Sequence, residues 1–90
     1  MSEVTIIYKT KVTVDLGLKK IEEYLKSKGW TDNGPYGQFG RFYLNKEASK
    51  EVIVPTTDKI GDFNTRMNEL VQEVADAEER SVPNLLEHLK

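Results

Sequence analysis

The chain has 90 residues, and its 13 Lys and Arg against 15 Asp and Glu give a formal net charge of −2. It contains no cysteine, which excludes a disulfide scaffold, a cysteine zinc cluster and a cysteine nucleophile. Its apolar runs fall far short of the roughly 20 residues that cross a bilayer, and its first residues lack the pattern of a signal peptide. We therefore expect one cytoplasmic domain over residues 1–90, without membrane contact.

Residues 3–14 alternate between apolar and polar positions, which predicts a strand with one buried face. Twelve residues is about twice the usual strand length, so part of this strand needs a partner. We expect a homodimer that pairs through strand 3–14; the alternative is a bulge near Thr10 that folds the segment into its own hairpin. The residues on the apolar parity are Val4, Ile6, Tyr8, Thr10, Val12 and Val14.

The next segment has the spacing of an amphipathic helix over residues 16–28. Asp15 is the predicted N-cap, because its carboxylate can accept from the free amides of the first turn. Gly29 stands where a left-handed residue ends a helix, and Trp30 follows as the apolar residue that packs back on the last turn.

Residues 31–40 are rich in turn-forming types and predict a loop. A strand over residues 39–44, a polar connection and a short strand over residues 51–54 then predict a hairpin, which Pro55 closes.

A long helix is predicted after Gly61, because apolar residues recur there at the helical period. Asp62 is its predicted N-cap, and the spacing predicts the ion pairs Asp62–Arg66 and Asp76–Arg80. One stripe is marked by six apolar residues and by Glu78, and its first five residues are expected to pack on strand 3–14. The six apolar residues are Phe63, Met67, Leu70, Val71, Val74 and Ala75.

Pro83 interrupts the helical pattern, and Ser81 before it is typical of an N-cap, so a short helix over residues 82–89 is predicted. The element order is then β-α-β-β-α-α. This order indicates an α+β fold, in which an antiparallel sheet of about three strands carries the helices on one face.

The segment 34–43 interleaves glycines with aromatic residues and an arginine. Aromatic rings beside Arg can stack on the bases of single-stranded RNA; the alternative is cross-strand packing of the rings, with the glycines at a bulge. The candidate binding residues are Tyr36, Phe39, Arg41 and Tyr43, together with Lys9 and Lys11 on strand 3–14.

Glu69, Glu73 and Asp76 recur on one face of the long helix, as a site for a basic partner or as a solvated face. His88 is the only histidine and lies at the end of a surface helix, where a cation suits the helix dipole. We expect no catalytic residue, no metal site and no cofactor, and therefore no enzyme.

Two motifs carry a resemblance to a known family: Lys26-Ser27-Lys28-Gly29-Trp30 closes a helix, and Val52-Ile53-Val54-Pro55 closes a strand. In this respect the segment from Leu18 to Leu70 resembles HicA-like toxins, small bacterial mRNA interferases with a fold like that of double-stranded-RNA-binding domains. That family's functional histidine lies in a Gly-Ser-His turn, whereas the corresponding turn here is Gly34-Pro35-Tyr36-Gly37-Gln38. The resemblance therefore implies kinship of fold without nuclease activity.

Size, mild acidity and missing catalytic chemistry favour a small protein-binding domain of bacterial or phage origin, such as an antitoxin, immunity protein or inhibitor. The alternative is an RNA-binding domain related to the HicA-like group, which the basic bias of residues 1–54 supports. Basic residues and exposed aromatics gathered on one sheet face would favour RNA. A bare apolar patch or an exposed strand edge would favour a protein partner.

Overall fold

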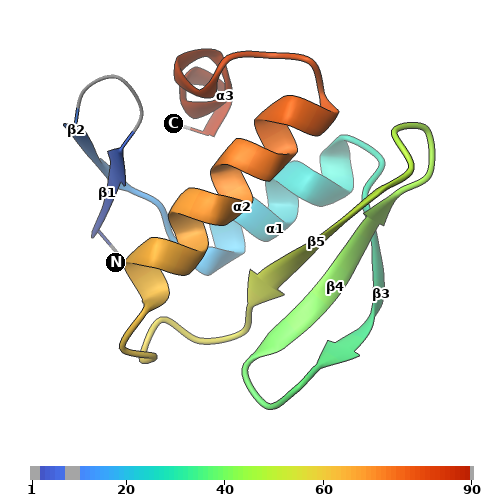
Figure 1. Cartoon of the computed structure of the whole chain (residues 1–90), viewed down its shortest axis with the longest axis horizontal. Coiled ribbons are helices and arrows are strands. Elements are labelled where there is room, and N and C mark those ends of the chain that lie inside the picture. The colour runs from blue at the N-terminus through green and yellow to red at the C-terminus, as the bar shows by residue number, and fades with distance from the viewer. Residues whose placement is uncertain (1–2, 8–10, 90) are drawn as a thin grey trace.

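The computed structural model describes residues 3–7 and 11–89, which form two antiparallel sheets and three helices (Figure 1). The helices lie on one side of the three-stranded sheet, so the α+β class with helices on one face is confirmed. The sheets are β1-β2 and β3-β4-β5. In chain order the elements are β1 (Glu3–Ile7), β2 (Lys11–Asp15), α1 (Leu18–Ser27), β3 (Thr31–Tyr36), β4 (Gly40–Asn45), β5 (Lys50–Pro55), α2 (Phe63–Ala77) and α3 (Val82–Leu89).

Residues 3–14 do not form one long strand, so that prediction was wrong. They form a hairpin of their own, β1-β2, as the alternative prediction had it, in which Val4 lies opposite Val14 and Thr5 opposite Thr13. The residues joining the two strands, with Thr10 among them, lie outside the described part of the chain. Because each strand pairs with the other along its length, excess strand length no longer argues for a dimer.

The outer edge of β1 is hydrogen-bonded by two asparagine side chains of α2. The Thr5 and Ile7 amides donate to Asn64 Oδ1 and Asn68 Oδ1, at 2.7 and 2.8 Å. Asn68 Nδ2 donates to the Thr5 carbonyl at 2.7 Å. Residues four apart lie on one face of a helix, so both asparagine side chains reach the β1 backbone. They make hydrogen bonds that a neighbouring strand would otherwise make, and they connect the N-terminal hairpin to α2.

The core forms around α2, which packs against β1 and against β5. The predicted apolar stripe is confirmed, since all six of its residues are buried, and Val4 and Ile6 on β1 are buried with them. Val14 is partly buried against the same cluster. Tyr8 lies outside the described residues. The other large core side chains come from the remaining elements and include Leu16, Ile21, Leu25, Trp30, Val52, Val54 and Leu85.

The start of α1 differs from the prediction. Its N-cap is Gly17 and not Asp15, because Asp15 is the last residue of β2 and pairs with Glu3. The predicted end is confirmed: Gly29 has φ +87° and the Trp30 amide donates to the Leu25 carbonyl at 2.9 Å.

The strand β3 lies where a loop was predicted. Its sequence, Thr31-Asp32-Asn33-Gly34-Pro35-Tyr36, contains no apolar alternation, and its pairing with β4 is broken by a bulge between Asp32 and Pro35. The Gly34 amide donates to Asp32 Oδ1 at 2.9 Å, which forms a local turn inside the strand. β3 is an edge strand, where glycine and proline are tolerated, so pairing with β4 decides its conformation rather than local propensity.

The end of α2 uses the same hydrogen-bond pattern as the end of α1, but without a glycine. Glu79 has φ +55°, and the Arg80 amide donates to the Ala75 carbonyl at 3.0 Å. Because the helix ends at Ala77, the predicted pair Asp76–Arg80 does not form and Arg80 pairs with Glu78 instead. The short helix α3 is confirmed over 82–89, and its first turn is capped by Ser81 Oγ, which accepts from the Asn84 amide at 3.2 Å.

These two helix ends predict opposite effects of glycine. Glu79→Gly should stabilise the fold by about 1 kcal/mol, because it removes the cost of a left-handed non-glycine residue. Gly29→Ala should destabilise it by about the same amount, since an added Cβ would meet no atom within 4 Å and only the backbone cost remains. Denaturant titration followed by Trp30 fluorescence measures both. Glu79→Ala is the control: it removes the side chain but keeps the strained conformation, and equal stabilisation by alanine would contradict the argument.

Candidate functional site

One face of the three-stranded sheet is left open. Strand register places Tyr43, Val52 and Val54 on the face toward the helices, where all three are buried. The alternate residues Phe42 and Ile53 lie opposite each other on the other face, where the part of the chain that the structure describes places no helix (Figure 1). Both are partly exposed. The sheet therefore has one covered face and one apolar face toward solvent.

The apolar face continues into a groove of about 230 Å³ at the β3–β4 turn. Tyr36 and Phe39 stand at the groove with 49% and 52% of their surface exposed, more than any aromatic core residue. Asp62 and Arg66 lie at the rim as an ion pair of 2.9 Å, which confirms the pair predicted from the sequence. Ile53, Pro55 and Ile60 complete the apolar lining. We call this surface the aromatic groove.

Close contacts between neighbouring strands shape the groove. The Tyr36 and Phe42 rings meet edge to face with centroids 5.1 Å apart. Gly40 lies opposite Tyr36 in the register, and a Cβ there would come within 3.1 Å of Ile53 Cγ2 and of the Tyr36 carbonyl. Glycine at this position therefore leaves room for the Ile53 side chain and the Tyr36 carbonyl. The Tyr36–Phe42 contact is an example of the cross-strand ring packing that the sequence offered as an alternative.

The other residues proposed for RNA contact do not join Tyr36 and Phe39. Tyr43 is only 3% exposed and belongs to the core, so its ring has no free face for a base. Arg41 Nε donates to Asp32 Oδ2 at 2.7 Å, and this hydrogen bond lowers the pKa of the Asp32 carboxyl. Lys11 begins β2, in the other sheet, and Lys9 lies outside the described residues. The described basic and aromatic candidates thus form no single surface.

The acidic residues Glu69, Glu73 and Asp76 lie on the side of α2 away from its buried stripe. Glu69 and Asp76 are exposed and Glu73 is partly exposed. This arrangement is that of a solvated helix face. His88 is also exposed, with its Nδ1 2.9 Å from the Asn84 carbonyl oxygen in its own helix.

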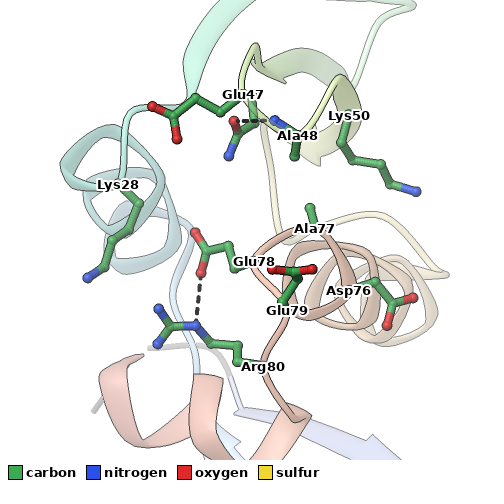
Figure 2. Close-up of a pocket in the computed structure, with 10 residues that line it drawn as sticks. Lys28, Glu47, Ala48, Lys50, Asp76, Ala77, Glu78, Glu79 and Arg80 are labelled. Atoms are coloured by element: carbon green, nitrogen blue, oxygen red, sulfur yellow. Dashed lines mark hydrogen bonds and ion pairs between the residues drawn. The ribbon is translucent and has the colours of Figure 1, made fainter.

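A polar cavity of about 760 Å³ lies between the end of α1, the β4–β5 turn and the α2–α3 connection (Figure 2). Figure 2 shows Glu78 directed at Arg80, whose Nε lies 3.3 Å from Glu78 Oε1 as an ion pair. Two further side chains donate to the same carboxylate: Trp30 Nε1 to Glu78 Oε2 at 3.1 Å, and the Tyr24 hydroxyl to Glu78 Oε1. The Glu78 carboxylate is thus held by three side chains from three segments, which is a structural cross-link.

The protonation of Tyr24 follows from this arrangement. Burial, and then the hydrogen bond to Glu78, raise the pKa of the Tyr24 hydroxyl well above its ordinary value of 10.0. The Tyr24 hydroxyl therefore stays protonated near neutral pH and remains a hydrogen-bond donor to Glu78.

No family model, no curated protein and no solved structure matches this chain. Among residues 3–7 and 11–89 no helix is long and apolar enough to span a membrane. Within the same residues no three His, Asp or Glu side chains are grouped so that they could hold a metal ion. The function must therefore be argued from the surfaces themselves.

The sequence identified Tyr36 and Phe39 but missed the rest of the aromatic groove. A signal was present for Ile53: because Val52 and Val54 must face the core, the residue between them faces outward, and an isoleucine there is unexpected. Ile60 carries no comparable signal, since the segment between β5 and α2 has no period from which its direction follows.

The Tyr24–Glu78 hydrogen bond predicts a pH dependence. Above pH 10 the unfolded chain loses the Tyr24 proton while the folded chain keeps it, so the free energy of unfolding should fall as the pH rises. Tyr24→Phe should lack this part of the decline and should cost about 1.5–3 kcal/mol at neutral pH, because the Glu78 carboxylate loses a donor. Denaturant titrations from pH 7 to 11 on both proteins measure the difference. Parallel pH profiles for both would contradict the assignment.

Proposed function

We propose that this chain is a non-enzymatic protein-binding domain of bacterial or phage origin that acts in the cytoplasm, in the manner of an antitoxin, immunity protein or inhibitor. One observation carries the proposal: the sheet face away from the helices is apolar and ends in the aromatic groove, where Tyr36 and Phe39 stand half exposed. Exposed apolar residues that gather on one face and have a polar rim are typical of protein interfaces.

The composition of the groove fits that role. Tyrosine, phenylalanine and arginine are enriched at protein interfaces, and aromatic anchors of this size can dominate the energy of binding. The Tyr36 ring is already held by Phe42, so its ordering on binding costs little conformational entropy. The Asp62–Arg66 pair supplies a charged rim that excludes mismatched partners.

Binding is tested with the variant Tyr36→Ser/Phe39→Ser, compared with the control Ile7→Ser. Ile7 is 54% exposed on β1, in the other sheet, so the control also removes an exposed apolar side chain but leaves the groove intact. Each protein is immobilised and exposed to nuclease-treated extract of the cells that encode it. A protein captured by the wild type and by Ile7→Ser, but lost with the double variant, supports the proposal.

The size of the effect is measured as the affinity of each variant for the captured protein. Loss of two anchors should weaken binding at least 100-fold, because one such anchor contributes 2 kcal/mol or more. Trp30 fluorescence establishes that all three proteins are folded. Retention of the captured protein by the double variant, or equal loss with Ile7→Ser, would show that the groove is not the binding surface.

A second candidate is an RNA-binding domain related to the HicA-like group and without nuclease activity. The order α1-β3-β4-β5-α2, with the Gly29-Trp30 helix end and the Val54-Pro55 strand end, supports it, because the resemblance implies this order. The pairing of Arg41 with Asp32 and the burial of Tyr43 weigh against it.

RNA binding, if this second candidate holds, should be weak and sensitive to salt. A chain of net charge −2 can neutralise few phosphates, and each contact adds slightly less than one unit to the log–log salt slope. Titration of single-stranded and duplex RNA at low and at physiological salt measures this, with Phe39→Ser as the stacking control. No binding at low salt would eliminate the candidate.

A further inference from the structure

The two outer edges of the β1-β2 hairpin differ. The β1 edge is hydrogen-bonded by Asn64 and Asn68. Thr5 and Thr13 lie opposite each other, and the Thr5 amide points away from β2. In an antiparallel pair both residues of such a position point their amides and carbonyls outward. Among the described residues no strand pairs with this side of β2, so Thr13 presents its amide and carbonyl at the outer edge, and the alternation extends this to residues 11 and 15.

The sequence of this edge is complementary to itself. β2 reads Lys11-Val12-Thr13-Val14-Asp15. If a second copy of the strand runs antiparallel with its Thr13 opposite Thr13, then Lys11 lies opposite Asp15 of the second copy. Val12 then lies opposite Val14, and symmetry repeats both pairs. Opposite charges, β-branched residues and threonines are favourable cross-strand neighbours, so all five positions match in this one register.

We propose that the partner of this edge is a second copy of the chain, and that two β2 strands pair antiparallel about Thr13 to form a four-stranded sheet, β1-β2-β2-β1. The positions of the outward-pointing backbone groups agree with this register. The outward groups belong to residues 11, 13 and 15, and these are the residues that pairing about Thr13 brings into hydrogen-bonded positions. A two-fold contact of this type is isologous and closes on itself.

The charge pattern within one copy supports the same partner. Glu3 lies opposite Asp15 in the hairpin, and two carboxylates in cross-strand positions repel each other. The second copy places a lysine on the other side of Asp15, which offsets that repulsion. In the single chain the exposed Lys20 Nζ lies 3.5 Å from the Asp15 carbonyl, a contact that a backbone amide of the second copy can replace.

An apolar groove lies beside the outer edge of β2. A groove of about 350 Å³ follows β2 and is lined by Val14, Leu16, Leu86 and Leu89, with Lys20 at its side. In the proposed sheet the second strand runs alongside this groove, next to Val14. On the opposite face the Thr5 and Thr13 hydroxyls are 3.2 Å apart, and pairing extends this contact into a row of four threonines.

Charge reversal tests the register. Asp15→Lys places two lysines opposite each other across the proposed interface, but it converts the repulsive Glu3–Asp15 pair within the hairpin into an attractive one. The variant should therefore fold at least as stably as the wild type and dimerise about tenfold more weakly. Lys11→Glu/Asp15→Lys restores opposite charges across the interface and should restore dimerisation. Sedimentation equilibrium at micromolar concentration measures the mass, which is 10.3 kDa for one copy.

Cross-linking tests the symmetry axis. The chain has no cysteine, so Thr13→Cys introduces a single thiol at the proposed axis. Residues facing each other there have Cα atoms about 5.5 Å apart, within the range of a disulfide. Thr5→Cys is the matched control: it lies on the same face, but the two copies are separated by three strand spacings, about 14 Å. Oxidation should cross-link Thr13→Cys rapidly and leave Thr5→Cys as a single chain.

Three results would overturn the proposal. The first is a single-chain mass for the wild type at all concentrations. The second is a dimer that Asp15→Lys leaves unchanged, and the third is equal cross-linking of Thr5→Cys and Thr13→Cys. Because the aromatic groove lies on the other sheet, none of these results bears on the proposed binding function.

Discussion

The fold depends on one helix that serves two sheets. α2 buries a single stripe of side chains, yet this stripe packs on β1 and on β5, which belong to separate sheets and are not hydrogen-bonded to each other. An isolated two-stranded hairpin is marginally stable in water, so β1-β2 depends on α2 for its apolar cover and for the asparagine amides along its edge. The Glu78 cluster then fixes the far end of the same helix to α1 through Tyr24 and Trp30.

This arrangement has a consequence for function, because the helices are all committed to the core. With their apolar stripes buried, the exposed large apolar side chains of the described residues lie on the sheets: Tyr36 and Phe39 at the three-stranded sheet and Ile7 on β1. Tyr36 and Phe39 remain half exposed there, and the proposed protein-binding function rests on this observation. The same reasoning separates Tyr43 from them, although it is only seven residues from Tyr36.

The sequence predicted the elements whose residues alternate or repeat with a regular period. The buried stripe of α2, the helix α3 and the Gly29 end of α1 follow from local patterns, and the structure agrees. The hairpin β1-β2 was only the alternative to one long strand, because its alternation continues from one strand into the next and the period does not reveal where the chain reverses. β3 was missed because its pairing is decided by β4. The contacts of Asn64 and Asn68 with β1 could not be predicted for a related reason. Both residues lie on a polar helix face, and only the tertiary structure places a strand distant in sequence beside it.

The contact between β1 and α2 also bears on how the chain folds as it is synthesised. Thr5 and Ile7 are separated by about 60 residues from the asparagines that bind them. At about 5–20 residues per second, the ribosome makes the first strand several seconds before its helix. During that interval the hairpin has two unpaired edges and no apolar cover, a state in which strands associate non-specifically. The β1 edge therefore gains its asparagine hydrogen bonds only after α2 has been synthesised, and docking of α2 then protects this strand from non-specific association.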